Sequence, residues 1–91
     1  MERVSSVTAF VLRYLGPPEI VPDAHVIVEK LRPIERRVLE LLARVPQREE
    51  RRHRLAGETR ESWEPARYER VEARALLRLQ HELQLSGLLA P

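Results

Sequence analysis

Arginines recur at helical spacing in the C-terminal part of the chain, at Arg67, Arg70, Arg74 and Arg78. Steps of three and four residues bring side chains onto one line along an α-helix. Guanidinium groups are planar donors that match phosphate and carboxylate oxygens, so such a line could bind a phosphate backbone. A solvated helix face would explain the same spacing equally well.

The carboxylates of the same stretch leave most of these arginines without a helical partner. Glu69 and Glu72 lie one or two positions from the nearest arginines, and side chains at that spacing do not face one another on a helix. Only Arg78 has a carboxylate at the i+4 position, Glu82. We therefore expect another segment, water or a polyanion to pair the remaining arginines.

A long helix over residues 65–85 would position these arginines. Most of its residues are Ala, Leu, Arg, Glu or Gln, which are strong helix formers. Pro65 suits the first helical position, and Trp63 and Tyr68 then occupy the two positions of a hydrophobic staple. We prefer this structural role for Trp63 to a nucleic-acid contact. The side chains expected to face the core are Tyr68, Val71, Ala75, Leu76, Leu79 and Leu83.

The N-terminal residues 4–15 carry apolar side chains at helical spacing and predict a helix. Ser5 or Ser6 could cap its start, and Gly16 stands where a left-handed C-terminal residue belongs. The β-branched content of the stretch leaves a strand as the alternative.

Two more helices are predicted after the Pro-rich connector of residues 16–22. Residues 23–31 favour a short helix capped by Asp23, with a strand as the alternative. Residues 33–45 form a clearer helix, because Pro33 fits its first turn. Its apolar side is predicted to be Ile34, Val38, Leu39, Leu41, Leu42 and Val45, and its polar side Glu35, Arg36, Arg37, Glu40 and Arg44.

The segment 47–62 is polar, and only Leu55 and Ala56 could anchor it. It could form a helix that ends at Gly57, or a mobile loop. Its run R-R-H-R at 51–54 would add basic groups for a phosphate backbone, although charge runs are usually solvated.

Length and composition predict one all-α domain of four or five helices over residues 1–91. Residues 1–22 would form the N-terminal helix and connector, and residues 23–91 the helical core. The chain has no cysteine, no apolar run of about 20 residues and no signal-peptide pattern, so we expect a cytoplasmic protein without a membrane partner. Fifteen of its sixteen basic residues are arginine, which suits an anionic partner but also a coding bias or a thermophile's surface.

Residues suited to catalysis or metal binding do not cluster in the sequence. His25, His53 and His81 are scattered, the glycines are isolated, and no nucleophile motif is present. We expect no enzyme activity, no metal and no cofactor.

Two segments carry a resemblance to a known family. Residues 31–42, L-R-P-I-E-R-R-V-L-E-L-L, resemble the first helix of the fourth conserved region of bacterial sigma factors. Residues 67–79, R-Y-E-R-V-E-A-R-A-L-L-R-L, resemble the recognition helix of that region, and also the ending of phage late-gene regulators of the ArpU/RinA type. The resemblance implies a transcription regulator that inserts a helix-turn-helix into double-stranded DNA, with RNA polymerase as a further partner.

The same resemblance assigns roles to individual residues. Arg67 and Arg70 would face bases or nearby phosphates, and Arg74 and Arg78 would follow the backbone. Arg60 would stand at the turn position that glycine usually occupies. A homodimer would fit, because helix-turn-helix proteins commonly read paired half-sites. The predicted DNA-binding residues are Arg54, Arg60, Arg67, Arg70, Arg74 and Arg78.

Two other function classes compete with DNA binding. The part of the chain from Trp63 onward, ending R-L-Q-H-E-L-Q-L, also resembles CbpM-type modulators, which bind J-domain co-chaperones. Such a protein-binding adaptor would present an exposed apolar groove. A homo-oligomeric structural subunit would instead bury Leu85, Leu88 and Leu89 between copies.

Overall fold

The computed structural model describes residues 3–16 and 22–90. Its helices are, in order, α1 (Val7–Phe10), the π-helical turn η1 (Val11–Leu15), α2 (Pro22–Val28), α3 (Pro33–Arg44), α4 (Arg48–Thr59) and α5 (Pro65–Leu85). In the described ranges, the β-structure is confined to one isolated bridge between Val4 and Leu89. The predicted all-α fold is therefore confirmed.

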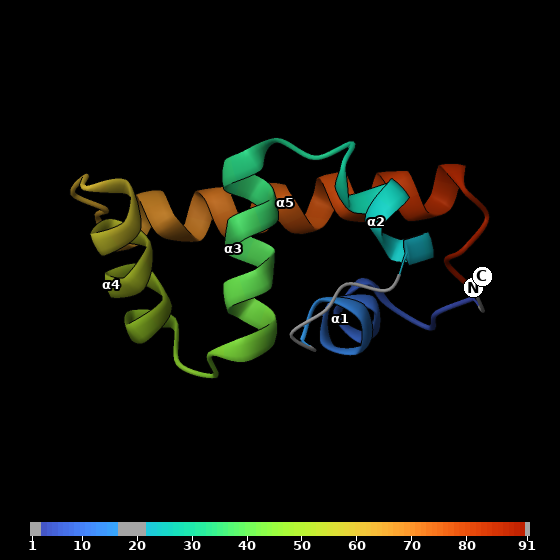
Figure 1. The fold of residues 1–91 in the computed structure, drawn as a ribbon, viewed down its shortest axis with the longest axis horizontal. Helices are drawn as coiled ribbons and strands as arrows, with labels where there is room; N and C mark the ends of the chain where they lie inside the picture. The colour runs from blue at the N-terminus through green and yellow to red at the C-terminus, as the bar shows by residue number, and fades with distance from the viewer. Residues whose placement is uncertain (1–2, 17–21, 91) are drawn as a thin grey trace.

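The long axis of the molecule is α5, and the other helices pack along it (Figure 1). Its 21 residues extend roughly 30 Å at the usual helical rise, and the whole molecule is 37 Å long. At its N-terminal end it packs beside α4, its middle is crossed by α3, and its C-terminal half contacts α1 and α2. The bounds of α5 match the prediction of a helix over residues 65–85.

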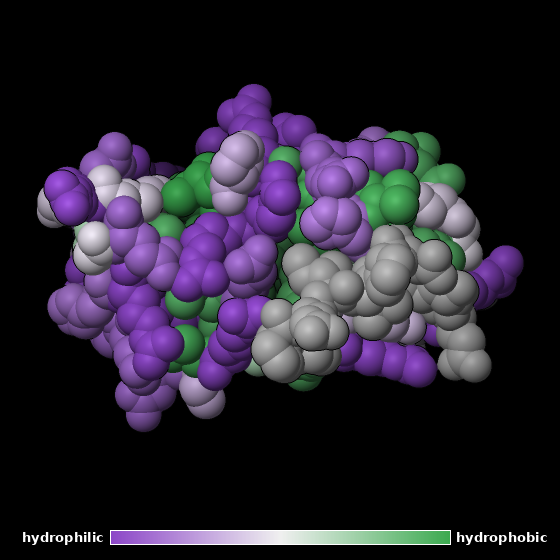
Figure 2. All heavy atoms as spheres, in the orientation of Figure 1, coloured by the Kyte–Doolittle hydropathy of each residue, from purple (hydrophilic) through white to green (hydrophobic). Residues whose placement is uncertain are grey.

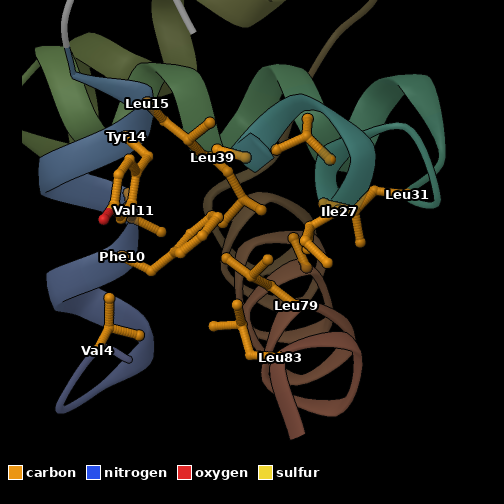
Figure 3. Close-up of a cluster of buried hydrophobic side chains, with 13 residues drawn as sticks. Val4, Phe10, Val11, Tyr14, Leu15, Ile27, Leu31, Leu39, Leu79 and Leu83 are labelled. Atoms are coloured by element: carbon orange, nitrogen blue, oxygen red, sulfur yellow. The ribbon is translucent and has the colours of Figure 1, made fainter. Parts of the chain in front are cut away.

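Two clusters of buried side chains hold the helices together. The first lies among α1, η1, α2, α3 and the C-terminal half of α5, where Phe10 points toward Leu79 (Figure 3). The second joins α3, α4 and the N-terminal end of α5 around Leu55 and Tyr68. Both clusters include side chains of α5, and all of those predicted to face the core are buried or half-buried: Tyr68, Val71, Ala75, Leu76, Leu79 and Leu83.

Trp63 precedes α5 and is 4% exposed, in the same buried cluster as Tyr68. Its indole Nε1 donates a hydrogen bond of 2.9 Å to the hydroxyl of Thr59, so its polar edge is satisfied inside the protein. Pro65 is the first residue of α5. The predicted hydrophobic staple is confirmed, and Trp63 has a structural role.

The N-terminal helix begins at Val7, with the Ser6 hydroxyl accepting a hydrogen bond from the backbone N–H of Ala9. The predicted helix and its Ser6 cap are confirmed, and the strand alternative is wrong. The left-handed conformation predicted for Gly16 is also wrong, since its φ is −70°. Glycine is needed there for space, because a Cβ would lie 2.8 Å from the carbonyl oxygen of Leu12.

Residues 23–31 contain most of α2, so the predicted short helix is confirmed and the strand alternative is wrong. Because α2 already begins at Pro22, Asp23 lies in its first turn and not at the predicted N-cap position. Residues 17–21 of the predicted connector lie outside the described residues.

The polar segment forms α4, which continues past Gly57 to Thr59. The predicted end at Gly57 and the loop alternative are both wrong, because contacts beyond Gly57 hold the last turn. The Thr59 hydroxyl donates to the carbonyl of Leu55 and accepts from Trp63. The helix ends instead at Arg60, which takes the left-handed conformation with φ 56°.

The predicted polar side of α3 contains one error, Glu35, which is only 2% exposed. Its Oε1 accepts a hydrogen bond of 3.1 Å from the backbone N–H of Arg32, so it caps the first turn of α3. The carboxylate is thereby turned toward α5 instead of solvent.

The chain ends are tied together at the first cluster. The Val4 N–H donates to the Leu88 carbonyl, and the Ala90 N–H donates to the Val4 carbonyl. Leu88 and Leu89 pack partly buried against this cluster, so they cap the core. Leu85 is 69% exposed.

Candidate nucleic-acid interface

Arg70 and Arg74 are the most available cations of α5. Both side chains are exposed, and neither forms a hydrogen bond or an ion pair with another residue in the described ranges. They lie one helical turn apart on the same face. The nearby Ala66 and Ala73 are exposed and small, so they would let another molecule approach the α5 backbone closely.

Arg67 is held by the segment that precedes α5. Its guanidinium lies 3.8 Å from the centroid of the Trp63 ring and donates to the carbonyl of Ser62 at 3.0 Å. It also lies 3.3 Å from a carboxylate oxygen of Glu61, in a pair that is open to solvent. Another segment therefore pairs Arg67, as one of the sequence alternatives allowed.

Arg78 does not pair with Glu82, contrary to the expectation from the i+4 spacing. Its Nε lies 3.4 Å from the buried carboxylate of Glu35. Glu82 instead lies 3.7 Å from the Nζ atom of Lys30 in the turn after α2. Arg78 pairs with Glu35 in preference to Glu82 because Glu35 is buried in the α3–α5 contact. An unpaired charge costs more free energy when it is buried than when it is partly exposed, as Glu82 is.

The arginines at the start of the R-R-H-R run hold α4 in place. Arg51 is 5% exposed and donates to the carbonyls of Val45 and Pro46 at 2.8 and 2.9 Å. Its other guanidinium nitrogens face the carboxylate of Glu72 at 3.3 and 3.5 Å. Arg52 donates to the carbonyl of Trp63 at 2.8 Å. Their donors are therefore used inside the protein, which removes both residues from the predicted basic surface.

The buried pair of Arg51 and Glu72 is a feature that sequence reasoning missed. A signal was present, because Glu72 lies four residues after Tyr68 and three before Ala75, inside the apolar stripe of α5. A carboxylate in such a stripe must be paired when it is buried. Arg51 supplies that pair from α4.

Arg54 and Arg60 lie away from the α5 arginines. Arg54 pairs with Glu50 on its own helix at 2.9 Å. One turn after Arg54, Glu58 forms a pair with Arg37 of α3, so this side of α4 faces α3 and not α5. Arg60 is exposed at the end of α4. The structure thus brings four of the six predicted residues together on α5: Arg67, Arg70, Arg74 and Arg78.

The shifted pKa values belong to structural pairs and to the core. Hydrogen bonding to Arg37 lowers the pKa of Glu58, and hydrogen bonding to Arg52 lowers the pKa of Glu49. Burial raises the pKa of Tyr68 to about 12. The pair of Arg37 and Glu58 joins α3 to α4, whereas Arg52 and Glu49 both lie on α4.

On the face shown in Figure 2, hydrophilic side chains cover most of the half around α4, with small hydrophobic areas between α3 and α4, and larger hydrophobic areas lie near α2 and the C-terminal part of α5. Across residues 3–16 and 22–90, no helix is long and apolar enough to cross a membrane. The same residues contain no group of three or more histidine, aspartate or glutamate side chains that could hold a metal ion.

Comparisons with protein-family models, curated proteins and solved structures found no match to this chain.

Proposed function

We propose that this protein is a small, non-enzymatic DNA-binding transcription regulator that docks α5 on duplex DNA. In this proposal α4, the turn of residues 60–64 and α5 act as a helix-turn-helix. The B-DNA major groove is about 12 Å wide and an α-helix with its side chains about 10–12 Å across, so one helix fits it. Double-stranded DNA is the proposed partner, and RNA polymerase and a second copy of the chain are further proposed partners.

The observation that carries the proposal is the availability of Arg70 and Arg74. The two guanidinium groups are exposed on one helix face and lack polar contacts with other described residues. Neighbouring arginines on α4 are used in buried or partly buried contacts. Unpaired arginines on an exposed helix face can neutralise phosphates and release counterions without first breaking a protein contact.

The remaining arginines of α5 differ in how easily they could join this contact. Arg67 would have to leave Glu61, and that pair costs little to break because both side chains are partly open to water. Arg78 is held by a buried carboxylate, so its Nε is already engaged by Glu35. We expect about three phosphate contacts in total, from Arg70, Arg74 and one of the two flanking arginines.

A salt titration of binding to random-sequence duplex DNA, followed by fluorescence anisotropy, tests the proposal. With about three phosphate contacts, log affinity should fall against log salt with a slope of about −3. The variant Arg70→Ala/Arg74→Ala should make this slope less steep by about two, because it loses two phosphate contacts. A matched control, Arg13→Ala/Arg44→Ala, removes the same charge from η1 and α3 and should keep the native slope. No binding at low salt would refute DNA binding by this chain.

A protein-binding adaptor, such as a modulator of a J-domain co-chaperone, is the second candidate. It is favoured by Leu77 and Leu85, which are 66% and 69% exposed on the C-terminal half of α5. In that case the Arg70→Ala/Arg74→Ala variant should bind its partner like the native protein, whereas Leu77→Ala/Leu85→Ala should not.

A further inference from the structure

An open hollow of about 390 Å³ lies along α5; it shares Arg74 and Arg78 with the DNA contact proposed above and extends beyond them to His81. Its lining residues are the basic Arg74, Arg78 and His81, together with Leu77 and Glu82. The three basic side chains follow one another at steps of four and three residues, so they lie on one helix face. A hollow of this size has room for a phosphate group.

The basic groups of the hollow retain free donors. Arg74 and His81 are exposed and have no polar contact with another described residue. Arg78 meets Glu35 through Nε, so the two terminal nitrogens of its guanidinium remain available to a ligand. Two arginine side chains and one imidazole supply the donors that phosphate oxygens accept from proteins.

The carboxylates around the hollow are each matched by a cation. Glu82 lines the hollow, but its carboxylate lies 3.7 Å from the ammonium group of Lys30. Glu35, on α3, is buried behind Arg78. Among the side chains of the α2 region that the structure describes, His25 and Glu29 pair with each other at 3.0 Å, and α1 carries no titratable group. The charged groups that line the hollow beside His81, or that pair with its lining residues, are therefore Arg74, Arg78, Glu82, Lys30 and Glu35.

We propose that Arg74, Arg78 and His81 form a phosphate-binding site that extends the DNA contact of α5 toward its C-terminus, anchors the DNA backbone and makes DNA binding dependent on pH through His81. The inference rests on the proposed function. His81 lies about 16 Å along the helix axis from Arg70, since eleven residues rise by 1.5 Å each, whereas Arg74 lies about 6 Å from Arg70. The site therefore extends the contact along α5 instead of repeating the one at Arg70.

Histidine can change its charge between about pH 5 and pH 8, and a bound phosphate favours the protonated imidazole. DNA binding would then take up a proton at this site. The affinity for DNA should consequently rise as the pH falls, and the number of released counterions should rise with it.

Anisotropy titrations of duplex DNA at about pH 6 and about pH 8 test the inference with native protein and with His81→Gln. The native protein should bind about three-fold to five-fold more tightly at the lower pH, and its salt slope should steepen by about 0.9. The His81→Gln variant should lose both differences. The control His25→Gln removes an exposed histidine from α2, outside the proposed helix-turn-helix, and should keep both.

The outcomes separate the inference from the proposed function. DNA binding by the native protein with no change between the two pH values, or with a change that His81→Gln retains, overturns the inference and leaves the proposed function standing. No DNA binding at low salt overturns both. Loss of the pH dependence in His81→Gln alone supports the site, because a merely structural histidine would not set the proton linkage.

Discussion

The arginines of α4 and those of α5 differ in what holds their charge. Arg51 and Arg52 on α4 donate to backbone carbonyls and carboxylates, whereas Arg70 and Arg74 on α5 have no polar contact in the described part of the chain. The run on α4 is the denser one in the sequence, yet it supplies fewer free cations. Availability for a polyanion thus depends on the partners of each guanidinium and not on how closely arginines follow one another.

The arginines of α4 and α5 differ in this way because α4 has few apolar side chains. Leu55 is its one fully buried apolar residue in the described structure. Arg51 takes the place of a second apolar anchor, since its guanidinium binds the chain just after α3 and the carboxylate of Glu72. The long α5 has enough apolar side chains to anchor itself, so its arginines can remain on the surface.

The largest effect should follow from breaking the buried pair. Glu72→Leu leaves Arg51 buried without its carboxylate, which should lower the free energy of unfolding by about 3–5 kcal/mol. Urea denaturation followed by circular dichroism measures it.

The double variant Arg51→Met/Glu72→Leu is the control for this prediction. It removes both charges together, so it should lose much less stability than Glu72→Leu. If Glu72→Leu costs under about 1 kcal/mol, the pair does not hold α4 to α5 as described.

A smaller effect should appear at alkaline pH through Tyr68, whose side chain is buried where α4 meets α5. Burial raises its pKa to about 12. In the unfolded chain the phenol loses its proton near pH 10, so the free energy of unfolding should fall by about 2–3 kcal/mol as the pH rises from about 10 to about 12.

Guanidinium denaturation at the two ends of this pH range measures the loss, and Tyr68→Phe serves as the control. The substituted protein should lack this part of the pH dependence while keeping that of the other titrating groups. An identical pH dependence in both proteins would contradict the prediction, because it would show that Tyr68 is not shielded from water where α4 meets α5.

The smallest effect should come from freeing a partly held arginine. Glu61→Gln removes the carboxylate partner of Arg67, and we expect DNA affinity to rise by about two-fold to five-fold. Glu50→Gln makes the same change of charge beside Arg54 and should raise affinity less. Equal gains in the two variants would mean that net charge, and not the release of a particular guanidinium, governs binding.

Much of the fold followed from apolar spacing and proline positions. The bounds of α5, the first turn of α3 at Pro33 and the staple of Trp63 on Tyr68 were all predictable, because each depends on residues close in sequence. The residue at which α4 ends was not predictable in this way. Gly57 is the better local stop, but the contacts of Thr59 with Leu55 and Trp63 carry the helix on to Arg60.

The candidate site was also predictable only in part, because some of its features depend on contacts with other segments of the chain. Helical spacing placed the arginines of α5 on one face, and the structure has them there. Which of them are free depends on Glu61 and Glu35, which the fold brings from other segments. No periodicity within residues 65–85 contains that information.

The most direct test of the central comparison is an NMR titration of the arginine Nε–H signals with a short DNA duplex. We expect the signals of Arg70 and Arg74 to shift or broaden as DNA is added, while those of Arg51 and Arg52 stay unchanged. Changes at Arg52 and Arg54 with none at Arg70 and Arg74 would contradict it, because DNA would then bind the helix whose arginines hold the fold together.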